Sequence, residues 1–132
     1  MSKKILILDD EPQRTEAVLD RVKHDLGEES VLYAQNYAEA INFLENYEIC
    51  CMSIDMIIPK DERMLFHDSL VYGLNVLKEI RQKKEALPIA CYSIIQEIDV
   101  IIQIEKLNAI YLHKKDKMAF YKLIDFFKKH FK

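Results

Sequence analysis

The sequence predicts an α/β fold, with a parallel sheet of five strands and helices on both of its faces. Short apolar runs alternate along the chain with segments in which apolar residues recur every three or four positions. That pattern is typical of strands that alternate with helices. The run 49–55, ICCMSID, is apolar on both faces over most of its length, as in a strand inside a parallel sheet. Right-handed crossovers between five such units predict the flavodoxin-like strand order 2-1-3-4-5.

The elements are placed by their apolar patterns and by the residues that end them. Pro12 suits the first turn of a helix, with an acid just before it as a cap, and Gly27 ends that helix after Leu26. The Ile-rich segment 96–107 also suits a strand, but its length and its place after a strand favour a helix. The predicted strands are 4–9, 30–35, 49–55, 88–93 and 109–113. The predicted helices are 12–26, 37–47, 96–107 and 116–131, and one that begins at Gly73 and ends before Pro88.

Composition limits the class of protein. The chain has 132 residues, half of them apolar, which suits one compact domain over residues 1–132. The formal net charge of −3 argues against nucleic-acid binding, since such domains usually carry a basic excess. No apolar run reaches the length of about 18 residues that a membrane span needs, and no signal peptide is evident. We therefore expect a cytoplasmic protein, in which the three cysteines are reduced core residues.

Polar side chains follow the predicted strands at the points where they end. Asp9 and Asp10 follow the first strand and Asp55 ends the third, while Ser93 and Lys114 close the fourth and fifth. Ligands of such sheets bind at this edge, and clustered carboxylates disfavour ionisation unless a cation neutralises them. Mg²⁺ meets that need with oxygen ligands, and a carboxylate beside it can act as a nucleophile toward phosphorus. A lysine and a serine would then hold the phosphoryl oxygens.

Four segments together resemble the receiver domain of response regulators in two-component signalling. ILILDDEP resembles the first strand and acidic pair of that family, and IDMIIP its phosphoacceptor segment, with Pro59 four residues after Asp55. PIACYS resembles the segment that carries the family's Ser/Thr, here Ser93, and YLHK its aromatic residue and lysine, here Tyr111 and Lys114. The likeness covers nearly the whole chain, and the four segments occur in the family's order.

The resemblance implies a role for each matching residue. Asp55 would accept a phosphoryl group from a histidine kinase or a phosphotransfer protein, and Lys114 and Ser93 would bind the phosphate. Asp10, Asp55 and the backbone carbonyl of Ile57 would bind Mg²⁺, with Asp9 acting through water. Ser93 and Tyr111 would form the switch. They would change the face made by segments 96–107, 109–113 and 116–131, where an output protein binds. Enzymatic activity would be limited to self-phosphorylation and self-dephosphorylation.

Three features depart from the family's pattern. Thirteen residues, KDERMLFHDSLVY, separate Pro59 from Gly73, an insertion at 60–72 beside the predicted site whose apolar members suggest a packed loop or short helix. Ile94 stands where the family mostly has a small residue, and Ile57 and Ile95 would flank the acyl phosphate, so we expect slow loss of the phosphoryl group. Lys115 replaces the proline that usually follows the lysine, which favours a trans peptide bond there.

Other functions stay open at the level of sequence. A pseudo-receiver, an interaction module without phosphotransfer, is the main alternative, and Ile94 and the insertion support it. An Mg²⁺-dependent phosphohydrolase lacks its usual Asp-x-Asp, and a flavin-binding protein lacks its phosphate loop. The segment 96–107 holds more Ile and Val than one buried stripe needs. Val100 and Ile104 are additional to the stripe Ile98, Ile101 and Ile102, which indicates a partner or homodimer contact.

Overall fold

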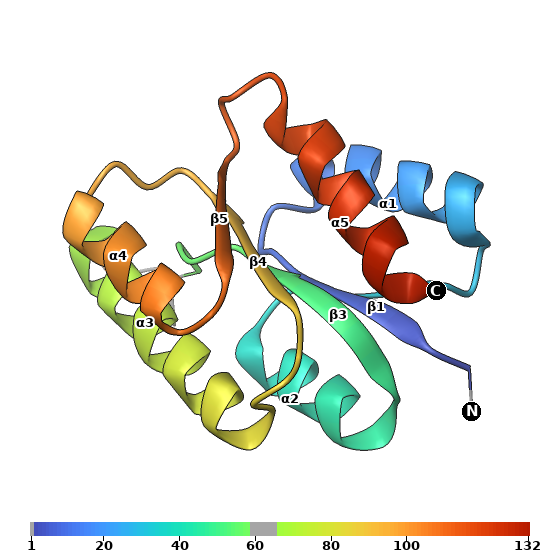
Figure 1. Ribbon diagram of the computed structural model, residues 1–132, viewed down its shortest axis with the longest axis horizontal. Helices are drawn as coiled ribbons and strands as arrows, with labels where there is room; N and C mark the ends of the chain where they lie inside the picture. Colours follow the sequence, from blue (N-terminus) through green and yellow to red (C-terminus); the bar gives the residue numbers. More distant parts are fainter. Residues whose placement is uncertain (1, 59–65) are drawn as a thin grey trace.

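A computed structural model describes residues 2–58 and 66–132, and within them the predicted fold is confirmed (Figure 1). All strand pairs are parallel, in the order β2-β1-β3-β4-β5. The strands are β1 (Lys4–Leu8), β2 (Val31–Ala34), β3 (Ile49–Ile54), β4 (Ile89–Ser93) and β5 (Ile110–His113). The helices are α1 (Pro12–Leu26), α2 (Tyr37–Asn46), α3 (Phe66–Lys83), α4 (Ile98–Lys106) and α5 (Ala119–Phe131). No described helix is long and apolar enough to cross a membrane.

The two faces of the sheet are covered by different helices (Figure 1). The strand residues Leu6, Met52 and Ile89 point toward α2, α3 and α4. Together with residues of these helices they form the larger core cluster. Their strand neighbours Ile5 and Cys51 lie in a second cluster, which α1 and α5 complete. This division follows from the strand period of two, which sends successive side chains to opposite faces. We refer to these as the α2/α3/α4 face and the α1/α5 face.

The start of α3 differs from the prediction. The helix begins at Phe66, so Gly73 lies inside it, and residues 66–72 of the insertion are helical. Residues 59–65, which include the rest of the insertion, lie outside the described residues. The helix extends because its apolar pattern does: Leu70, Leu74 and Leu77 follow one another at helical spacing and are all buried. The stretch 66–72 thus matches the predicted short helix, joined without a break to the helix that was expected to begin at Gly73.

Gly73 is needed where it stands because the helix approaches the backbone of another segment. A Cβ atom at this position would lie 2.1 Å from the carbonyl oxygen of Met56 and 2.9 Å from its carbonyl carbon. Glycine inside a helix costs about 1 kcal/mol relative to alanine, so its presence is explained by this contact rather than by helix formation. Met56 directly follows Asp55, so the contact brings α3 against the loop that carries this carboxylate.

Smaller boundary differences concern the helix ends. The helix expected from residue 116 begins at Ala119, because Asp116 closes a turn in which its carboxylate accepts the Met118 N–H at 2.9 Å. The acid before Pro12 is Glu11, whose side chain makes no capping hydrogen bond, although the Thr15 hydroxyl donates to its carbonyl oxygen at 2.8 Å. Cys51 and Cys91 are buried free thiols as expected, while Cys50 is only half-buried.

Candidate functional site

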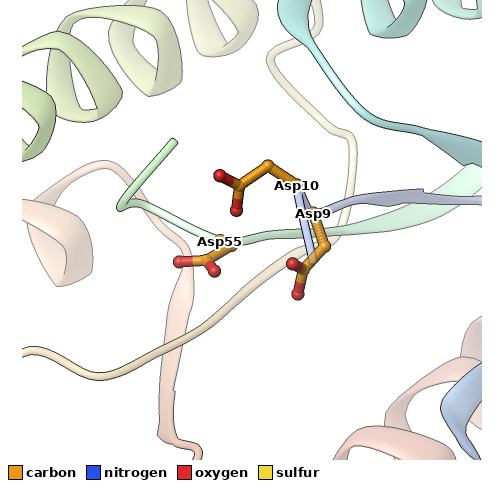
Figure 2. Close-up of side chains that lie close together, drawn as sticks. All are labelled: Asp9, Asp10 and Asp55. Carbon is orange, nitrogen blue, oxygen red and sulfur yellow. The ribbon is translucent and has the colours of Figure 1, made fainter. Parts of the chain in front are cut away.

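The three acidic residues converge at the carboxyl edge of the sheet (Figure 2). Asp9 and Asp10 follow β1 and Asp55 follows β3, and these strands pair with Leu8 opposite Ile54. One carboxylate oxygen from each residue lies within 4.8 Å of the others. Carboxylate oxygens at this spacing are the hard donors that Mg²⁺ takes in proteins. The donor set therefore fits the predicted ion, with Asp10, Asp55 and Asp9 as the side chains that would hold it.

Ser93 and Lys114 reach the same cluster from β4 and from the end of β5. The Ser93 hydroxyl donates to Asp55 Oδ1 at 2.6 Å, within a fully buried contact. The Lys114 ammonium donates to Asp55 Oδ2 at 3.0 Å and to Asp9 Oδ2 at 2.7 Å. Both hydrogen bonds are charge-assisted and largely shielded from water, which strengthens them. The structure thus brings together all five polar residues that the sequence places at the strand ends.

The two neighbouring acids of β1 have different surroundings. Asp9 is 6% exposed, and its Oδ1 accepts the backbone N–H of Glu11 at 2.9 Å while its Oδ2 accepts from Lys114. Asp10 is half-buried and forms no salt bridge within the residues that the structure describes. Asp10 therefore keeps more free oxygen lone pairs for a cation than Asp9, in line with the direct role predicted for Asp10 and the indirect role predicted for Asp9.

The charges of the site act on one another. Burial raises the pKa of Asp9, which the hydrogen bond from Lys114 opposes and the charge of Asp55 reinforces. Burial also raises the pKa of Asp10, with further contributions from the charges of Asp55 and Asp9. Burial disfavours the charge of Lys114, yet the carboxylates of Asp55 and Asp9 outweigh it and raise the pKa of this lysine. A single ammonium thus compensates three clustered acids only in part, and the remaining repulsion favours a bound cation.

Tyr111 fastens the loop after β4. Its hydroxyl accepts the backbone N–H of Ile95 at 2.9 Å and lies 2.8 Å from the Ile95 carbonyl oxygen and 3.2 Å from that of Ser93. The phenol has one proton to donate, and the shorter distance favours the carbonyl of Ile95. The predicted switch pair is therefore physically connected, since Tyr111 holds the loop that begins at Ser93, which itself contacts Asp55.

The three isoleucines expected near the site have different positions. Ile94 is half-buried and lines a cavity together with Asp55 and Lys114, and its effect on access to the acid stays a prediction. The prediction for Ile95 is wrong: this residue is 1% exposed and belongs to the core of the α2/α3/α4 face. β4 ends at Ser93, and beyond it the Tyr111 hydroxyl holds the backbone of Ile95 with that side chain turned toward the core. Ile57 is half-buried and packs against the same core.

Two further observations bear on the backbone of the site. No peptide bond among the described residues is cis, so the bond after Lys114 is trans as expected, and Lys114 nevertheless reaches both Asp9 and Asp55. The Ile57 N–H donates to Asp55 Oδ1 at 3.0 Å. The cation-binding role of the Ile57 carbonyl stays a prediction.

Sequence reasoning missed two residues at this site. Gly73 contacts the loop after Asp55, as described above, which no local pattern reveals because the two residues meet only in the folded chain. Ser53 is 3% exposed and lines the cavity beneath the site. The signal for Ser53 was present, since a polar residue two positions before Asp55 shares the face of that carboxylate in an otherwise apolar strand.

Comparisons with known proteins agree with this fold. A receiver domain from Methanospirillum hungatei, described as CheY-like, matches 99% of the chain with 94% of its own length, at 17% identity and a TM-score of 0.77. The response regulator TrrA from Thermotoga maritima, solved with Mg²⁺ and BeF, matches 98% of both chains at 22% identity and a TM-score of 0.71. A receiver domain from Clostridium thermocellum matches 99% of the chain and 94% of its own, at 24% identity and a TM-score of 0.73.

No family model and no curated protein sequence matches the chain. The chain nevertheless has the fold of response-regulator receiver domains over nearly its whole length.

Proposed function

We propose that this protein is a phosphoacceptor in phosphorelay signalling and takes a phosphoryl group on Asp55. The observation that carries this proposal is the pair of contacts to Asp55, from Ser93 at 2.6 Å and from Lys114 at 3.0 Å. Both groups donate hydrogen bonds to the carboxylate whose oxygen would attack phosphorus. They are therefore well placed to donate to the oxygens of an arriving phosphoryl group. The fold, shared with receiver domains, supports phosphorelay signalling in general.

The transfer uses groups of this chain at each step. An Asp55 oxygen attacks the phosphorus of a phosphohistidine on a histidine kinase or phosphotransfer protein, the P–N bond breaks, and the imidazole leaves with a proton. A mixed carboxylic–phosphoric anhydride forms on Asp55. Ser93 and Lys114 then exchange their bonds to the carboxylate for bonds to phosphoryl oxygens. A bound Mg²⁺ would neutralise phosphoryl charge, and Asp10, Asp55 and Asp9 are the side chains that would hold it.

The output would pass through Tyr111 to the α4–β5–α5 face. Movement of Ser93 toward the phosphoryl group disturbs the loop that the Tyr111 hydroxyl fastens, and this loop leads into α4. The face already exposes large apolar side chains, which suits a protein partner or a second copy of the chain. Of the stripe predicted as buried, Ile98 is 72% and Ile102 is 45% exposed, whereas Ile104 is fully buried. The predicted apolar surplus is therefore present, but on residues other than those expected.

Formation of a beryllofluoride adduct tests the proposal. The protein is mixed with Mg²⁺ and beryllofluoride and followed by fluorine and amide NMR, and a separate sample receives the small phosphodonor acetyl phosphate. We expect a stoichiometric adduct and a labile phosphoprotein in the wild type and neither in Asp55→Asn. Asp10→Asn should retain the fold and lower the affinity for Mg²⁺ at least about tenfold, because one of the direct ligands is lost.

The matched control is Asp20→Asn, which removes an exposed acid of α1 away from the cluster and should leave the adduct unchanged. Failure of the folded wild type to form any adduct would contradict the proposal and favour a pseudo-receiver. Continuous release of phosphate with many turnovers would favour a phosphohydrolase instead.

The lifetime of the phosphoprotein is a second measurement. Ile94 lines the same cavity as Asp55, where its side chain would hinder the approach of a water molecule, so we expect slow hydrolysis and faster decay in Ile94→Ala. A wild-type lifetime of seconds, or no change in the variant, would contradict the role of Ile94.

A further inference from the structure

A cavity lies beneath the acidic cluster on the α1/α5 face. It has a volume of about 340 Å³, within the range of small-ligand sites, about 300–1,000 Å³. Its walls come from β1, β3, β4, α1 and α5, and its apolar part is formed by Ile7, Val18 and Leu123. Asp9, Asp55 and Lys114 form its boundary with the site described above. The cavity therefore extends from the acid cluster into the hydrophobic layer under α1 and α5.

Spare hydrogen-bond donors remain in this cavity beside its carboxylates. Asp9 and Asp55 already accept from Lys114, from Ser93 and from backbone N–H groups. Lys114 uses two of its three hydrogens on these carboxylates, which leaves one. The Ser53 hydroxyl lines the cavity on a residue that is 3% exposed, and it makes no hydrogen bond to any residue that the structure describes.

Lys115 supplies a second positive charge at the rim. Its side chain is exposed and lines the cavity, and its ammonium forms no salt bridge within residues 2–58 and 66–132. An occupant that fits these walls has an apolar body for Ile7, Val18 and Leu123. It also has an oxygen acceptor, preferably charged, for the spare donors of Ser53, Lys114 and Lys115.

We propose that this cavity is a binding site for a small carboxylate with an apolar body. The apolar part lies between α1, α5 and the sheet, and the carboxylate is held by the lysines and the Ser53 hydroxyl. The cavity adjoins the acid cluster and shares Asp9, Asp55 and Lys114 with it, but binding of a carboxylate does not require that Asp55 accepts a phosphoryl group. Because Lys114 is shared, a bound carboxylate and a cation at the acid cluster would alter each other's affinity to the same extent.

Benzoate is the probe, and methyl NMR of the full chain without Mg²⁺ or phosphodonor is the measurement. We expect saturable shifts of the Ile7, Val18 and Leu123 methyl groups at concentrations up to about 20 mM. Benzyl alcohol, which has a similar shape without the charge, should bind at least about fivefold more weakly. The smaller hollow between α2 and α3, about 160 Å³ and lined by Ile41, Leu44 and Ile80 among others, is the internal control. Its methyl groups should not shift.

Two variants test which groups hold the probe. Ser53→Val removes the hydroxyl and fills part of the cavity, so benzoate affinity should fall at least about tenfold. Lys115→Met keeps the length of an exposed side chain without its charge and should weaken binding about threefold, whereas Lys117→Met, on the same loop but outside the cavity, should not. The proposal is overturned by any of three results: no saturable shift in the folded wild type, equal binding of the two probes, or unchanged benzoate affinity in Lys115→Met.

Discussion

The two faces of the sheet are packed differently next to the acidic cluster. On the α2/α3/α4 face, helix α3 packs against the backbone directly after Asp55 through Gly73, and Tyr37 and Tyr72 form an edge-to-face pair with ring centroids 5.0 Å apart. On the α1/α5 face the same edge stands over a cavity of about 340 Å³. The helices of this face are joined at its other end, where Lys128 pairs with Asp25 at 2.8 Å.

This difference separates two tasks. A close backbone contact such as that of Gly73 with Met56 transmits a displacement, because the two segments have no free space between them. A hollow face admits a ligand but transmits little. A change at Asp55 should therefore pass first to α3 and α4, whereas α1 stays where it is. The four predictions below test this division, beginning with the largest expected effect.

Gly73→Ala should destabilise the protein by about 2–3 kcal/mol, because the added methyl group overlaps the Met56 carbonyl and α3 or the loop must move. Urea unfolding measures the change. Helix propensity alone gives the opposite sign, a gain of about 1 kcal/mol. Asn75→Ala, at an exposed position of the same helix, is the control and should change little. Equal or higher stability of Gly73→Ala would show that the close contact does not constrain the fold.

Arg81→Met should cost about 2 kcal/mol, since it leaves several backbone carbonyls without their donor. The guanidinium donates to the Leu107 carbonyl at 2.7 Å and to that of Leu87 at 2.8 Å, and it also reaches Lys84, Glu85 and Asn108. It thereby ties the end of α3 to the end of α4. We expect lower stability in urea and faster amide exchange around Leu107. Lys78→Met, an exposed change on α3, should do neither; a similar loss in both variants would contradict the role of Arg81.

Tyr111→Phe should cost about 1 kcal/mol, because the phenol fastens the loop after β4 by its contacts to Ile95. The amide of Ile95 should exchange faster with solvent, and the beryllofluoride adduct should change the spectrum of α4 less than in the wild type. Tyr121→Phe, at an exposed position of α5, serves as the control. An unchanged exchange rate of the Ile95 amide would show that Tyr111 does not link the site to α4.

Asp25→Asn should give the smallest effect, and one that depends on pH. Hydrogen bonds from Lys128, His24 and Arg21 hold the pKa of Asp25 well below its usual range. A carboxyl group whose folded-state pKa is lowered stabilises the fold above its unfolded-state pKa, and this contribution disappears as the pH falls through the folded-state value. The thermal midpoint of the variant should therefore lie below that of the wild type at pH 7, with a smaller difference at pH 3. A constant difference would show that packing, not charge, joins α1 to α5.

The sequence predicts the sheet, its strand order and the five polar residues at its edge, because these depend on periodicity and on which residues end each strand. The ends of the strands alone are enough to predict that Asp9, Asp55 and Lys114 lie close together. The start of α3 was misjudged because Gly73 was taken as a boundary, although the apolar spacing from Leu70 to Leu77 continues through it. The position of Ile95 and the contact of Gly73 with Met56 depend on packing between distant segments, which no local pattern reports.

The length of α3 has a consequence for access to Asp55. Its 18 residues correspond to about 27 Å at 1.5 Å per residue. Gly73 lies against Met56, directly after Asp55, so the first two turns of α3, about 10 Å by the same rise, precede this contact. If Asp55 accepts a phosphoryl group as proposed, we expect a donor protein to contact these first turns of α3, whereas a small phosphodonor would not.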